Sequence, residues 1–182
     1  MIRAYITDRT ALGGIAPLLD NIARNAREGI DYIQLREKDL SGRELFDLTR
    51  EALLRIGSTG TKLLVNDRAD IAMAAGAHGV HLRSNSLPAR EWRRVLPPDF
   101  LIGVSCHTLE DIEEAESADF VVYGPVFETP GKGPPVGLAG LADAVKHTST
   151  PVLALGGIAD RNKHLCLEAG AAGIAAIRLF QQ

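Results

Sequence analysis

Short apolar runs alternate with amphipathic segments along most of the chain. Each run has the length and β-branched composition of a buried strand, and most of the segments between the runs repeat apolar residues at helical spacing. The pattern predicts eight strands, at residues 3–7, 32–36, 62–65, 79–82, 101–104, 120–123, 151–155 and 173–177. It predicts seven helices between them, at residues 15–26, 41–56, 68–75, 88–96, 109–116 and 138–146 and after Asp160.

Local signals mark several of these helix starts. Ser41 and Glu44 have the spacing of a capping box, Thr108 and Asp160 are expected N-caps, and Pro17 falls in the first turn, where proline is tolerated. Strict alternation of strand and helix predicts a parallel sheet, and eight such units close a (β/α)8 barrel. An open doubly wound sheet is the alternative, but no GxGxxG motif follows the first strand.

The predicted barrel forms a single domain over residues 1–182 and lacks its last helix, because no helical segment follows the eighth strand. Such a barrel would expose apolar surface on one flank, so a homodimer that covers this surface is expected.

Composition narrows the class of protein. The content of 46% hydrophobic and 24% charged residues is ordinary for a globular domain, and the net charge of −3 argues against nucleic-acid binding by bulk electrostatics. No apolar run is long enough to span a membrane, and Met1 leads directly into a strand, so a cytoplasmic protein is expected. Cys106 and Cys166 lie far apart and indicate neither a zinc site nor a disulfide scaffold.

The end of the second predicted strand carries the first candidate site. Gln34, Arg36 and Lys38 alternate along it, so in a continuous strand they would share one face. Two fixed cations on one face repel each other unless an anion lies between them. A solvated edge strand is the structural alternative, but the apolar residues before Gln34 indicate a buried strand. The pattern therefore favours an anion-binding site at the carboxyl end of the barrel.

Further polar residues follow other predicted strands. The strand ends carry basic, amide, hydroxyl and glycine positions with a single carboxylate: Gln34, Arg36, Lys38, Asn66, Asp67, His81, Ser105, His107, Thr129, Lys132, Gly156 and Gly157. This set lacks the paired carboxylates of a glycosidase and a Ser-His-Asp arrangement. It suits a polyphosphate held by basic side chains, with a divalent metal on Asp67. Taken singly, Asn66–Asp67 also fits a helix N-cap, and His81 and His107 also fit hydrogen-bonded loop residues.

The motifs at these positions resemble thiamine phosphate synthase and its thiazole tautomerase relatives over nearly the whole chain. They are YITD (residues 5–8), QLREK (34–38), VNDR (65–68), GVHL (79–82), GVS (103–105), YGPVFET (123–129), Lys132 and GGI (156–158). The resemblance implies a barrel that couples hydroxymethylpyrimidine diphosphate to thiazole phosphate and releases pyrophosphate, with Mg²⁺ as cofactor and phosphorylated small molecules as its partners.

The resemblance also implies residue roles. Pyrophosphate would be held by Gln34, Arg36, Lys38, Asn66 and Lys132. Asp67 would hold magnesium, and Ser105 would lie near the departing diphosphate. The thiazole phosphate would be bound by Thr129 and the Gly156–Gly157 turn, and Ile177 and Arg178 are further expected substrate-binding residues. The residues expected to act in catalysis are Arg36, Lys38, Ser105 and Lys132.

Several positions depart from the family pattern. Ser86 stands where the second metal carboxylate is expected, Gly131 replaces a threonine, and Arg178 replaces a small serine position. Pro125 stands where the tautomerase branch has histidine, while Asp67 keeps an acidic residue that this branch more often loses. The main expectation is a thiamine phosphate synthase. The alternatives are a thiazole tautomerase-type relative and a non-catalytic barrel that binds phosphate ligands.

Overall fold

The computed structural model describes residues 1–182 and shows a closed barrel of eight parallel strands in sequential order, β1 to β8. The strands are β1 Ile2–Ile6, β2 Tyr32–Leu35, β3 Lys62–Asn66, β4 Gly79–Leu82, β5 Leu101–Cys106, β6 Phe120–Tyr123, β7 Val152–Leu155 and β8 Gly173–Ala176. β8 pairs with β1, from Ile2 opposite Gly173 to Tyr5 opposite Ala176, and this pairing closes the barrel. The predicted (β/α)8 barrel is confirmed.

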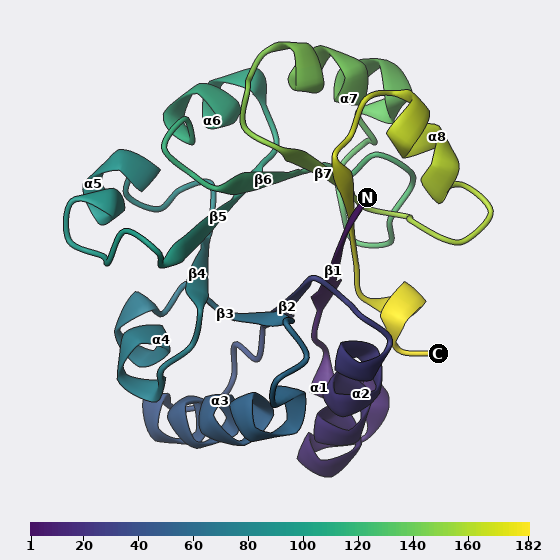
Figure 1. Ribbon diagram of the computed structural model, residues 1–182. Coiled ribbons are helices and arrows are strands. Elements are labelled where there is room, and N and C mark those ends of the chain that lie inside the picture. The colour runs from purple at the N-terminus through teal and green to yellow at the C-terminus, as the bar shows by residue number, and fades with distance from the viewer.

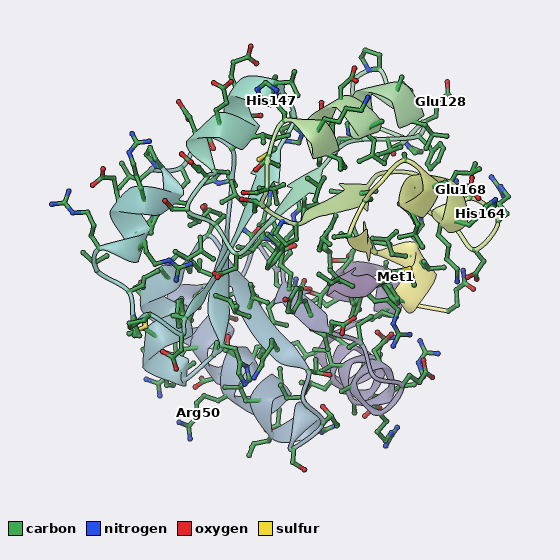
Figure 2. The ribbon with its side chains drawn as sticks, turned by 45° about the horizontal axis from the view of Figure 1, so that its top comes forward. Met1, Arg50, Glu128, His147, His164 and Glu168 are labelled. Atoms are coloured by element: carbon green, nitrogen blue, oxygen red, sulfur yellow. The ribbon has the colours of Figure 1, made fainter.

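The helices form an outer ring around the strands (Figure 1). They are α1 Arg9–Leu12, α2 Ile15–Arg27, α3 Gly42–Ile56, α4 Ala69–Ala75, α5 Ala89–Arg93, α6 Leu109–Glu114, α7 Gly137–Lys146 and α8 Lys163–Glu168. Polar side chains such as those of Arg50, His147 and His164 lie on the outside of this ring (Figure 2). None of the helices combines the length and apolar composition that a crossing of the bilayer requires.

Most predicted helix signals are confirmed. Ser41 and Thr108 both cap their helices in reciprocal capping boxes, and Pro17 lies in the first turn of α2. Two details were wrong. The connection after β1 contains the additional short helix α1, and the residue before α8 is Asn162. Asp160 instead accepts a hydrogen bond from the Lys163 ammonium group at 2.6 Å.

The core has two layers because successive strand residues face opposite sides. Inside the barrel, Tyr32 stacks on Phe120 with ring centroids 4.8 Å apart. Ile33 and Leu35 belong instead to the apolar layer that includes α2 and α3 residues. Gln34 shares the inward face with Tyr32, two residues further along β2, so this strand delivers a buried amide toward the carboxyl end of the barrel.

The flank beside β8 differs from the expectation. Only a short 3-10 turn, η1 Arg178–Phe180, follows β8, and it lies beside α2 (Figure 1). The Phe180 carbonyl accepts hydrogen bonds from the side-chain amides of Asn21 and Asn25 at 3.1 and 2.9 Å. Every residue of β8 is buried. Strand eight itself is therefore not bare, contrary to the expectation, whereas the expected homodimer stays a prediction.

Candidate active site

The carboxyl ends of all eight strands meet at one rim, because the strands are parallel and the barrel is closed. At this rim the Gln34 side chain donates a hydrogen bond to the Asn66 side-chain oxygen at 3.2 Å. Gln34 is buried and Asn66 is half-buried at the end of β3. This contact joins two predicted substrate-binding residues and fixes the direction of the Asn66 amide.

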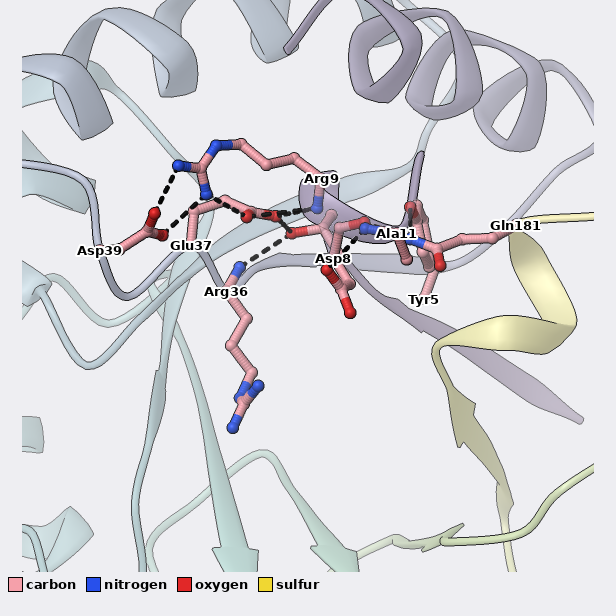
Figure 3. A network of polar contacts seen from close by, with 9 residues as sticks. Tyr5, Asp8, Arg9, Ala11, Arg36, Glu37, Asp39 and Gln181 are labelled. Atoms are coloured by element: carbon pink, nitrogen blue, oxygen red, sulfur yellow. Dashed lines mark hydrogen bonds and ion pairs between the residues drawn. The ribbon is translucent and has the colours of Figure 1, made fainter. Parts of the chain in front are cut away.

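Arg36 and Lys38 lie beyond the end of β2, which stops at Leu35. Strand alternation therefore does not explain their common placement, and this part of the sequence argument was wrong. Their position depends on the intervening residue, Glu37, whose side chain is only 3% exposed and turns away from the site. In Figure 3 the Arg36 side chain extends away from the contacts that Glu37 makes.

Glu37 is the centre of a buried polar network. Its carboxylate accepts a hydrogen bond from the Thr7 hydroxyl at 2.6 Å and one from the Arg9 backbone N–H at 3.2 Å. The Arg9 guanidinium pairs with Glu37 at 3.2 Å and with Asp39 at 2.6 Å (Figure 3). The Thr7 hydroxyl oxygen also accepts the backbone N–H of Arg36 at 3.0 Å. The network thus anchors the backbone from which Arg36 projects.

Four cations meet near the rim. The pKa of Lys38 lies below its usual range, first because of the Arg36 charge, then because of partial burial and the charges of Arg83 and Lys132. Asp67 acts in the opposite direction and is the smallest of these influences. Lys38 therefore lies within the electrostatic range of Arg36 and Lys132, the two cations with which it was expected to surround one anion. Such a set of like charges is relieved when an anion binds among them.

Asp67 has a partner that the sequence argument did not identify. Its carboxylate forms an ion pair with the Arg83 guanidinium, and its backbone lies in the left-handed region with φ of 64°, which residues other than glycine adopt rarely. Asp67 and Arg83 line a pocket of about 230 Å³ together with Lys38 and Asn66. The only signal in the sequence was a charged residue two positions after His81, where β4 ends.

The residues present do not fit the expected magnesium site. Asp67 is the single candidate carboxylate, it is already paired with Arg83, and Ser86 stands at the second position. No group of three or more histidine, cysteine, aspartate or glutamate side chains in the chain could hold a metal ion. Magnesium prefers near-octahedral oxygen coordination, which one occupied carboxylate does not supply.

His81 and Ser105 meet inside the barrel. The His81 Nε2 atom and the Ser105 hydroxyl share a hydrogen bond of 2.9 Å. Burial, and secondly the Arg36 charge, lower the pKa of His81 to about 4. The imidazole is therefore neutral at pH 7, and its role in the structure is to orient the Ser105 hydroxyl. His107 contacts the Gly124 carbonyl through Nδ1 at 2.7 Å, so it is a hydrogen-bonded loop residue.

A second, separate pocket of about 90 Å³ lies at the ends of β7 and β8. It is lined by the three residues that were expected to bind the thiazole phosphate, Thr129, Gly156 and Gly157. It is also lined by two further expected substrate-binding residues, Ile177 and Arg178. A β-carbon on Gly156 would lie 2.5 Å from the Pro125 side chain, and Gly156 has a φ of 100°. Only glycine therefore permits this turn to pack against the loop after β6, which carries Thr129 and Lys132.

Comparisons with known proteins show the family of this chain. A family model described as thiamine monophosphate synthase matches residues 4–180. A thiamine-phosphate synthase from a Roseiflexus species is 40% identical over 177 residues, which are 94% of this chain and 75% of that protein. A thiamine-phosphate synthase from Albidiferax ferrireducens is 38% identical over 182 residues, covering 97% of this chain and 83% of that protein.

A solved structure is also similar. The thiamine phosphate pyrophosphorylase from Pyrococcus furiosus superposes with a TM-score of 0.85 at 32% sequence identity. The match covers 97% of this chain and 85% of that one.

Proposed function

Because this chain belongs to the thiamine monophosphate synthase family, we propose that it is a transferase of thiamine biosynthesis, a thiamine phosphate synthase. It couples hydroxymethylpyrimidine diphosphate to thiazole phosphate and releases pyrophosphate. One observation carries the assignment: a cationic pocket and a glycine-lined pocket open at the same end of the barrel, where two phosphorylated substrates can meet.

The first step breaks the bond between the pyrimidine methylene carbon and the diphosphate oxygen. The bonding electrons leave with the diphosphate, and the pyrimidine amino group stabilises the cation that remains. Arg36, Lys38 and Lys132 neutralise the charge that develops on the leaving group, and such fixed cations act most strongly where charge increases. The Ser105 hydroxyl, which hydrogen-bonds to neutral His81 at 2.9 Å, would be placed near the departing oxygen.

The second step forms a carbon–nitrogen bond. The thiazole nitrogen donates its electron pair to the pyrimidine methylene carbon, so the coupling itself requires neither a base nor a protein nucleophile. The protein's contribution is to hold the two substrates in line. The pocket of Thr129, Gly156 and Gly157 would bind the thiazole phosphate, and Arg178 would add a positive charge at the position where the family has a small serine.

The cell location is part of the proposal. Both cysteines are buried and free, with no disulfide between them, which fits a reducing compartment. We place the protein in the cytoplasm, where phosphorylated intermediates of this kind are available.

The test is to incubate the purified protein with both substrates and to measure thiamine phosphate by mass spectrometry. Lys132→Ala should lower kcat/KM by about ten- to a hundredfold, because a charge-assisted contact to the leaving group is lost. Lys146→Ala, an exposed lysine on α7, is the matched control and should leave the rate unchanged. Absence of product in the wild type, with intact pyrophosphate binding, would indicate the non-catalytic alternative.

A further inference from the structure

The cationic pocket contains an arginine at the place where a metal ion was expected. We infer that the Arg83 guanidinium replaces magnesium beside Asp67 and binds the diphosphate directly, so that this chain holds its diphosphate without a metal. The inference rests on the proposed function, because it concerns the diphosphate of that reaction.

Local geometry places Arg83 in the position of a tethered cation. Arg83 pairs with Asp67 across the loops that follow β3 and β4, and both residues line the pocket that Lys38 and Asn66 also line. The Arg83 side chain remains 57% exposed, so much of the guanidinium surface is accessible to a ligand. A guanidinium has five N–H donors, and Asp67 does not use all of them.

Ser86 belongs to the same turn as Arg83. Its backbone N–H donates a hydrogen bond to the Arg83 carbonyl at 3.0 Å. The position that would carry the second metal carboxylate therefore lies three residues from the arginine, and the two departures are parts of one local change. A carboxylate is missing at one end of the turn, and a cation is present at the other.

The charges of the two arrangements match. Two carboxylates and one Mg²⁺ sum to zero, and Asp67 with Arg83 also sums to zero. Arg36, Lys38 and Lys132 then contribute three positive charges. A diphosphate monoester carries about three negative charges at neutral pH, since the second pKa of a terminal phosphate is near 6. The site is therefore neutralised by the substrate alone, with no charge left for a divalent cation to balance.

Arg83 also competes directly with a metal for Asp67. The guanidinium is protonated at every physiological pH and is attached to the same loop region, so it cannot diffuse away. Magnesium would have to displace it, lose several waters and gain only one carboxylate, although it normally requires substrate phosphates and well-placed oxygens as further ligands.

The experiment is calorimetric titration with inorganic pyrophosphate, in EDTA and in millimolar magnesium, with the free pyrophosphate concentration corrected for its magnesium complex. Wild-type protein should bind pyrophosphate in EDTA with an affinity within about threefold of that in magnesium. Arg83→Gln should weaken the binding in EDTA by about tenfold or more, because a charge-assisted contact is lost. Arg43→Gln is the matched control: Arg43 is an exposed arginine on α3 that pairs with Asp47 at 3.3 Å, and the affinity of this variant for pyrophosphate should be unchanged.

The double variant Arg83→Gln with Ser86→Asp should gain dependence on magnesium, because it restores two carboxylates and removes the competing cation. The inference is overturned by wild-type binding that requires magnesium, or by a loss of less than tenfold in Arg83→Gln. These results are independent of turnover. Pyrophosphate binding that requires magnesium, in protein that forms thiamine phosphate, would remove this inference and leave the proposed function. Metal-free pyrophosphate binding by protein that forms no product would leave the inference and remove the proposed function.

Discussion

The buried Glu37 network provides the sharpest stability prediction. Removing the carboxylate in Glu37→Ala takes away the acceptor of the Thr7 hydroxyl at 2.6 Å and of the Arg9 guanidinium at 3.2 Å. Breaking a buried ion pair by truncating one partner costs about 3–5 kcal/mol. Arg9 keeps Asp39 at 2.6 Å and is not left without a partner, so the lower end applies. We expect Glu37→Ala to lower the free energy of unfolding by about 3 kcal/mol.

The assay is urea denaturation followed by circular dichroism, with Glu37→Gln and Asp47→Ala measured in parallel. Glu37→Gln keeps an oxygen for Thr7 but loses the charge, so it should cost about 1–2 kcal/mol. Asp47 forms an exposed pair with Arg43, and its removal should change the free energy of unfolding by at most about 0.5 kcal/mol. If Glu37→Ala costs no more than Asp47→Ala, the network does not stabilise the fold and the reasoning is refuted.

Three further predictions concern pH, the glycine turn and assembly. The pKa of His81 is about 4 in the folded protein and near 6.5 in the unfolded protein. As pH falls, the unfolded state therefore binds a proton at a higher pH than the folded state does. The free energy of unfolding should fall by roughly 3 kcal/mol as pH drops from 6.5 to 4, and this decrease should be missing from His81→Asn when both proteins are unfolded with urea at each pH. The same pH dependence in both proteins would contradict the assignment. Gly157→Ala, whose β-carbon would lie 2.7 Å from the Phe127 side chain, should raise KM for thiazole phosphate at least tenfold, whereas Gly133→Ala, with nothing within 4 Å, should leave it unchanged. The homodimer stays a prediction: light scattering should give twice the chain mass of 19.5 kDa, and a monomer at micromolar concentration would contradict it.

The architecture could be predicted from the sequence because it depends on repeated local signals. Every strand was found within one or two residues, and the capping box at Ser41 and the N-cap at Thr108 were identified from the sequence alone. The glycine-lined pocket was also predictable, since Gly156 and Gly157 follow a strand and strand ends converge in a barrel.

The polar contacts between loops could not be derived in the same way. Sequence periodicity predicts which face of a strand a residue occupies only within the strand itself. Because β2 ends at Leu35, the periodicity does not apply to Arg36 and Lys38. The Arg83–Asp67 pair joins two loops 16 residues apart, and the Glu37 network joins the segment after β1 to the loop after β2. Such contacts depend on the three-dimensional course of the loops, which no local pattern specifies.

The stoichiometry of the coupling reaction tests the central claim most directly. Purified protein should convert hydroxymethylpyrimidine diphosphate and thiazole phosphate into thiamine phosphate and pyrophosphate in equal amounts, and product should be absent when either substrate is omitted. Both products can be quantified in one reaction by chromatography with mass detection. Folded protein that binds pyrophosphate but forms no thiamine phosphate, or that releases pyrophosphate without the thiazole substrate, would contradict the assignment of this chain as a thiamine phosphate synthase.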